Sequence, residues 1–104
     1  MEHLEYEFKE RGGETKAVQA YVLTGVVASG NLEVLMQSEN LQGGCRFVID
    51  TAANGFADSW QAVLADFMAR YRPANLLVSI NDHAASPAVV SLRLDQAYES
   101  LTGK

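Results

Sequence analysis

The change of hydrophobic period along the chain constrains its fold more than any other feature. At 56–71, "FADSWQAVLADFMARY", apolar residues recur three or four positions apart, which is the spacing of one helix face. Pro73 marks the end of this helix, because proline cannot continue the helical hydrogen bonds. A second helix begins after Ser86, a good N-cap, with Pro87 at its first position, and it ends at Gly103. The apolar faces consist of Phe56, Trp60, Val63, Leu64, Phe67, Met68 and Tyr71 in the first helix and of Val90, Leu94, Ala97, Tyr98 and Leu101 in the second.

Five strands are predicted in the remaining sequence. Residues 2–9 alternate strictly between apolar and polar, which is typical of a half-buried strand, and a loop is expected at 11–15. Residues 17–28 are apolar on both faces, which predicts a strand that is central in the sheet or covered on one face by a partner. The other three strands are predicted at 32–36, 45–51 and 75–81.

The predicted order of elements is therefore β-β-β-β-α-β-α. Short loops between four consecutive strands favour antiparallel pairing, and two helices with one apolar face each can cover one side of a sheet. We expect an α+β fold: a two-layer sandwich with a mainly antiparallel five-stranded sheet and two helices on one face. A chain of 104 residues is long enough for one domain, residues 1–104.

The charge balance argues against two classes of partner. Thirteen acidic residues and eight basic ones give a net charge of −5, so the chain has no strongly basic face with which to bind nucleic acid or an anionic membrane. No apolar run approaches the roughly 18 residues that a membrane-spanning helix needs, and the first residues do not resemble a signal peptide. We therefore expect a cytoplasmic protein without a nucleic-acid or membrane partner.

Few residues in the sequence could carry catalysis. His3 lies on the polar face of the first strand, which is typical of a solvated histidine, and His83 follows Asp82 in a predicted loop. An Asp-His pair can orient an imidazole base, but the sequence has no nucleophile elbow to accompany it. Cys45 is the only cysteine and is expected to be a small core residue. The carboxylates show no metal-binding spacing, so no metal site is predicted.

A serine stands in the predicted turn between the strands at 17–28 and 32–36. The turn is "SGN", in which Gly30 supplies a positive φ and Asn31 tolerates the left-handed region. Ser29 has no predicted base beside it and cannot act as a nucleophile alone. Serine is a common turn residue and needs no function there, but a hydroxyl at a loop tip can enter the active site of a modifying enzyme.

Three segments resemble one family. The sequence "VVASGNLEVLM" at 26–36 resembles the segment around the prosthetic-group serine of the acyl carrier (delta) subunit of biotin-independent malonate decarboxylase. "INDHAASPAVVSLRLDQAYES" at 80–100 and the tryptophan-containing helix at 54–68 are similar to later parts of the same family. Two departures are present: Asn31 replaces an expected Asp, which removes a negative charge beside Ser29, and Ala84 replaces an expected Gly.

This resemblance implies that the chain is a non-catalytic acyl carrier domain. Ser29 would be esterified to 2′-(5″-phosphoribosyl)-3′-dephospho-CoA, with Gly30 and Asn31 forming the turn around the attachment site. The arm would carry acetyl and malonyl groups as thioesters. The implied partners are an acetyl/malonyl transferase (alpha) subunit, the decarboxylase (beta and gamma) subunits, and a transferase that attaches the prosthetic group.

Three other hypotheses remain open from the sequence. The same elements could form a small-molecule-binding regulatory domain of ferredoxin-like type. The two-faced apolar strand could instead belong to a purely structural interaction subunit. The gamma subunit of citrate lyase is a related acyl carrier with the same prosthetic group, so malonate rather than citrate depends on the resemblance.

Overall fold

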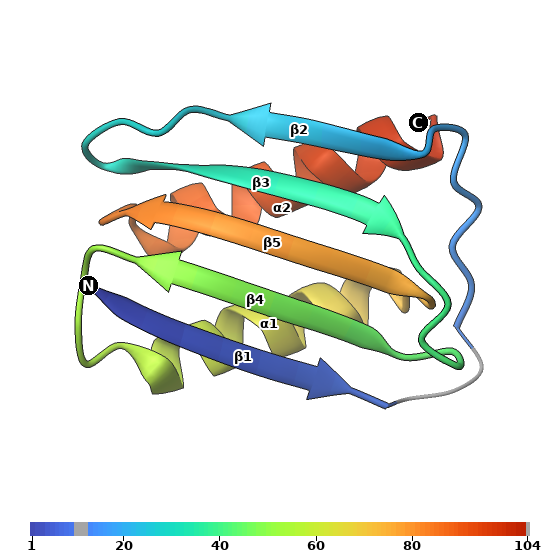
Figure 1. Ribbon diagram of the computed structural model, residues 1–104, viewed down its shortest axis with the longest axis horizontal. Helices are drawn as coiled ribbons and strands as arrows, with labels where there is room; N and C mark the ends of the chain where they lie inside the picture. Colours follow the sequence, from blue (N-terminus) through green and yellow to red (C-terminus); the bar gives the residue numbers. More distant parts are fainter. Residues whose placement is uncertain (10–12, 104) are drawn as a thin grey trace.

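The computed structural model describes residues 1–9 and 13–103. Seven elements follow in the predicted order of strands and helices, and both helices lie on the same side of one five-stranded sheet (Figure 1). They are β1 (Glu2–Phe8), β2 (Tyr21–Gly25), β3 (Asn31–Ser38), β4 (Cys45–Thr51), α1 (Ala57–Tyr71), β5 (Leu76–His83) and α2 (Pro87–Thr102). The predicted two-layer α+β sandwich is thus confirmed. Part of the loop expected at 11–15 lies outside the described residues.

The strands are arranged in the order β1-β4-β5-β3-β2. Three of the four pairings are antiparallel, and the pairing of β4 with β5 is parallel. Helix α1 makes the crossover connection that two parallel neighbours require. The prediction of a mainly antiparallel sheet is therefore correct.

Two predictions about the strands are wrong. Consecutive strands do not all pair, because β1 pairs with β4 rather than with β2. The strand expected at 17–28 is shorter and lies at an edge of the sheet, so the alternative that placed it in the centre is wrong, whereas a partner over its other face stays a prediction. Val22 is buried, but Tyr21 and Leu23 on the other face are 61% and 57% exposed. The apolar residues on that face are not covered by any described part of the chain, so the pattern alone does not give the strand's position.

The core lies between the sheet and the two helices. Alternate residues of β3, β4 and β5 point into it, and the helices contribute the apolar faces predicted from their spacing. Phe67 of α1 packs its ring against those of Phe47, Tyr71 and Tyr98, which joins both helices to the sheet. Fully buried side chains include Leu32, Val34, Met36, Phe47, Ile49, Leu64, Phe67, Leu76, Val78, Leu94 and Leu101.

The observed helix ends mostly agree with those predicted from the sequence. The Ser86 side chain accepts a 3.3 Å hydrogen bond from the Val89 amide at the start of α2, and Gly103 ends that helix with a φ of 79°. Phe56 is an exception, since it precedes α1 as its N-cap residue and its side chain is 53% exposed. Its assignment to the buried helix face is wrong, because the face begins one turn later at Trp60. Neither helix is long and apolar enough to cross a bilayer, considering residues 1–9 and 13–103.

Candidate functional site

Ser29 lies in a tight turn that closes the β2–β3 hairpin. The Asn31 amide donates a 2.9 Å hydrogen bond to the Ala28 carbonyl, so Ser29 and Gly30 are the two central residues of a β-turn. Gly30 has a φ of 75° and Ser29 does not have a positive φ, which is the pattern of a type II turn. The structure thereby explains the need for glycine after the serine. Asn31 is not left-handed here and instead begins β3.

The turn is fixed to the neighbouring strand. The Gly30 amide donates a 2.7 Å hydrogen bond to the carbonyl oxygen of His83, the last residue of β5. The Val26 amide donates to the Leu32 carbonyl at 3.1 Å and continues the hairpin beyond β2. The turn therefore lies at the end of the sheet where β5 finishes and α2 is about to begin (Figure 1).

The Ser29 side chain is exposed and makes no hydrogen bond with any described residue. Its hydroxyl is consequently accessible to another protein, and the described residues hold no base in contact with it. Nucleophilic catalysis needs a base within hydrogen-bond distance of the hydroxyl, and this geometry places none there among the described residues. It is compatible with modification of the hydroxyl by a second enzyme.

Asn31 connects the turn to α2. Its side-chain Oδ1 accepts hydrogen bonds from the Leu32 amide at 2.8 Å and from Nε of Arg93 at 3.2 Å. The second contact reaches from the hairpin to a residue 62 positions later in the chain. Arg93 was not among the site residues predicted from the sequence, because its approach to Asn31 depends on how α2 packs over β2 and β3.

The Asp82-His83 pair does not form a catalytic dyad. The Asp82 carboxylate is 3% exposed and accepts hydrogen bonds from the Thr51 hydroxyl at 2.7 Å and from the amides of Ala84 and Ala85 at 3.2 and 3.0 Å. Asp82 therefore holds together the ends of β4 and β5 and the start of the loop before α2. His83 ends a strand and does not lie in a loop as predicted.

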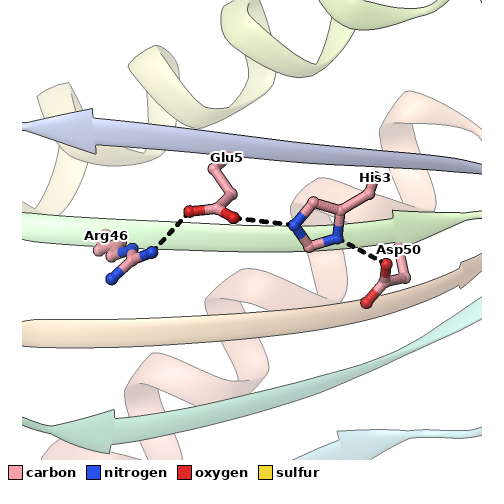
Figure 2. Close-up of polar contacts among 4 residues, drawn as sticks. All are labelled: His3, Glu5, Arg46 and Asp50. Atoms are coloured by element: carbon pink, nitrogen blue, oxygen red, sulfur yellow. Dashed lines mark hydrogen bonds and ion pairs between the residues drawn. The ribbon is translucent and has the colours of Figure 1, made fainter.

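A charged cluster that the sequence analysis did not predict lies on the sheet face opposite the helices (Figure 2). His3 Nδ1 lies 2.7 Å from Asp50 and Nε2 lies 2.9 Å from Glu5, whose other oxygen accepts a hydrogen bond from Arg46. The hydrogen bonds that the His3 ring donates to Asp50 and Glu5 raise the pKa of His3, and the hydrogen bonds that Glu5 accepts from Arg46 and His3 lower the pKa of Glu5. Both ring nitrogens have carboxylate partners, so the imidazole offers no free nitrogen to a substrate or metal.

Cys45 lies in the core, as the sequence predicts. Cys45 is buried, and its thiol lies 3.3 Å from the Pro73 carbonyl oxygen, to which it can donate. Within the part of the chain that the structure describes, no group of three or more His, Cys, Asp or Glu side chains is placed to hold a metal ion.

Comparisons with known proteins give one consistent result. The family model described as malonate decarboxylase delta subunit (MdcD) matches residues 19–101. A malonate decarboxylase acyl carrier protein from Xanthomonas campestris pv. campestris is 52% identical over 103 residues, covering 99% of this chain and 97% of that protein. The corresponding protein from Stenotrophomonas maltophilia K279a is 52% identical over 104 residues, covering 97% and 94%.

A solved structure is similar over nearly the whole chain. It is a chain in the crystal structure of a Pseudomonas malonate decarboxylase hetero-tetramer in complex with malonate. The two folds superpose with a TM-score of 0.83 at 35% sequence identity, and the match covers 97% of this chain and 99% of that chain.

Proposed function

This chain belongs to the malonate decarboxylase delta subunit family, and on that premise we propose that it is an acyl carrier subunit loaded with its prosthetic group at Ser29. The observation that supports Ser29 most directly is its position in the turn. Its hydroxyl is exposed and has no hydrogen-bond partner among the described residues, while the surrounding backbone is held by the β3 and β5 hydrogen bonds. A fixed turn with an accessible hydroxyl suits covalent attachment.

The residues of the turn also fit the proposed group, 2′-(5″-phosphoribosyl)-3′-dephospho-CoA. The group is anionic, and the four turn residues, Ala28 to Asn31, carry no charge that would repel its phosphates. When bound, it would supply a thiol on which acetyl and malonyl groups are carried as thioesters. The chain itself presents the serine, keeps the turn in a type II conformation, and holds the turn against the end of β5.

Attachment requires a second enzyme. No described residue places a base in contact with the Ser29 hydroxyl, so a transferase would have to remove the hydroxyl proton while the oxygen forms its bond to phosphorus and the bond between that phosphorus and the donor's phosphate leaving group breaks. The turn projects from the end of the sheet and can enter an active site without unfolding the domain. Gly30 contributes by giving the turn a tight shape with no side chain next to the serine.

The partners follow from the family. The similar Pseudomonas chain belongs to a hetero-tetramer, which supports a multi-subunit assembly. We propose that this carrier serves an acetyl/malonyl transferase (alpha) subunit and the decarboxylase (beta and gamma) subunits. A swinging arm suits this role because tethering raises the effective concentration of the acyl group at each site. The relatives favour malonate over the citrate lyase alternative and do not point to a ligand-binding regulatory domain.

Intact-mass spectrometry tests the proposal. The chain would be produced together with the attaching transferase, as wild type, Ser29→Ala and Ser100→Ala, the last altering an exposed serine on α2. We expect an adduct of the mass of the prosthetic group on wild type and Ser100→Ala and none on Ser29→Ala. The assembled complex should decarboxylate malonate only with the two loaded proteins. An adduct on Ser29→Ala, or no adduct on wild type, would contradict the assignment.

A further inference from the structure

Arg93 has an unusual place beside the attachment turn. Its side chain is half-buried on α2, where Nε donates to Asn31 at 3.2 Å and Nη1 donates to Gln96 Oε1 at 2.9 Å. Both acceptors are neutral amide oxygens. Among residues 1–9 and 13–103, no carboxylate oxygen lies within 4.0 Å of the Arg93 guanidinium.

Two other arginines show what a structural ion pair looks like in this protein. Arg46 contacts the carboxylate of Glu5, and Arg70 contacts those of Asp66 and Asp95. Arg93 instead remains positively charged and is not neutralised by a carboxylate in contact with it. A guanidinium has five N–H donors, and the two contacts above use two of them, so three stay available to an anion.

Arg93 contacts the residue two positions after Ser29. Asn31 follows Ser29 by two residues, and two residues of chain span at most about 7 Å between Cα atoms. The Asn31 side chain is itself fixed, because its Oδ1 also accepts from the Leu32 amide at 2.8 Å. The Asn31 side chain therefore holds the Arg93 guanidinium between α2 and the start of β3.

We propose that Arg93 binds the phosphodiester through which Ser29 carries its prosthetic group, an inference that rests on the proposed function. Guanidinium groups bind phosphate oxygens through paired, charge-assisted hydrogen bonds, and Arg93 has donors free for this purpose. The contact fixes the first bonds of the arm against the hairpin and leaves the distal thiol free to move. Arg93 is a binding residue for the group and takes no part in the acyl chemistry.

Phosphorus NMR on the loaded carrier tests this contact. The proteins compared are wild type, Arg93→Gln, Arg93→Lys and the control Arg72→Gln, which removes the same charge beyond the C-terminal end of α1. Intact mass first establishes that each carries the adduct. We expect Arg93→Gln to move the phosphodiester resonance toward its position in urea-unfolded loaded protein, Arg93→Lys to move it partway, and Arg72→Gln to leave it unchanged.

A second measurement needs no variant. In ¹⁵N-labelled wild type, the Arg93 side-chain resonances should shift between the unloaded and loaded proteins, while those of Arg72 should not. A phosphodiester resonance that is the same in wild type and Arg93→Gln, or Arg93 resonances that are unchanged by loading, would overturn the contact but not the proposed function. Wild-type protein that acquires no adduct with the transferase would overturn both.

Discussion

The amide of Gly30 and the carbonyl of His83 are joined by a 2.7 Å hydrogen bond, which ties the hairpin turn to the end of β5. Through this bond the proposed attachment site depends on a residue 53 positions later in the chain, since 83 − 30 = 53. The Asn31–Arg93 contact adds a second connection, to α2. The turn is thus an exposed loop that is held by one backbone contact and one side-chain contact, and this explains how an accessible serine can keep a defined position.

Replacement of Gly30 tests the shape of the turn. Gly30 has a φ of 75° but an added Cβ would meet nothing within 4 Å, so Gly30→Ala should cost only the backbone penalty of about 1–2 kcal/mol. Gly43→Ala is the matched control, with a φ of 88° and equally open space. Gly25→Ala should cost clearly more, because its Cβ would lie 2.1 Å from the Leu32 carbonyl oxygen. Urea unfolding of the three variants measures this order, and equal losses in all three would refute it.

Trp60 should be essential to stability. This residue of α1 points into the core and is only 6% exposed. Trp60→Ala should therefore lower the free energy of unfolding by about 3–5 kcal/mol. Phe56→Ala is the control, because this aromatic side chain one turn earlier is largely exposed and its loss should cost about 0.5 kcal/mol. Chemical denaturation measures both values. Similar losses at the two positions would show that the helix face is assigned incorrectly.

The Asp82 carboxylate should stabilise the end of the sheet that carries the serine turn. Asp82→Ala leaves the buried Thr51 hydroxyl and the amides of Ala84 and Ala85 without their acceptor. An unpaired buried polar group costs about 1–3 kcal/mol, so a loss of this size is expected from the Thr51 hydroxyl alone, and the two part-buried amides add to it. Asp82→Asn keeps one acceptor oxygen and should lose less. Denaturation gives the free energies, and faster hydrogen exchange at Ala84 and Ala85 should accompany the loss; unchanged exchange there would argue against the assigned role.

The charged cluster of Figure 2 predicts a pH dependence. Its hydrogen bonds to Asp50 and Glu5 raise the pKa of His3 above the ordinary value of about 6.5. The contribution of His3 to stability is therefore complete below about pH 6.5 and is lost as the pH rises through the raised pKa. The effect should be small, because all of these side chains are exposed and screened by solvent and salt.

An NMR titration of the His3 ring measures this pKa directly. Asp50→Asn should lower it more than Glu5→Gln, because Asp50 is the larger cause of the shift. Added salt should bring the wild-type pKa closer to the ordinary value. A wild-type His3 that titrates at or below that value would refute the interaction.

Local features were predictable from the sequence, and contacts between distant segments were not. The Ser86–Pro87 helix start, the burial of Trp60 and the positive φ of Gly30 each depend on a few neighbouring residues. The edge position of β2 was missed because Tyr21 and Leu23 are apolar yet largely exposed, so hydrophobicity on two faces did not mean burial on two faces.

In the candidate site, too, local features were predictable and contacts between distant segments were not. The turn at Ser29 was predicted from local turn chemistry, and the role of Ser29 as an attachment site is a prediction from the family resemblance. The contact of Arg93 with Asn31 and that of His3 with Asp50 span 62 and 47 positions, and they exist only because of the strand order and the packing of α2. No spacing along the chain indicates them.

The strand order also has a consequence for how the chain folds. The β2–β3 hairpin is closed by a loop of residues 26–30, whereas the pairing of β1 with β4 closes a much longer segment, residues 9–44. Short loops close at lower entropic cost, and non-local pairings slow folding. We therefore expect the hairpin to acquire protection early in pulse-labelled hydrogen exchange and β1 to acquire it last. In that order of events the serine turn takes shape first, and its attachments to β5 and α2 form only as those later segments pack.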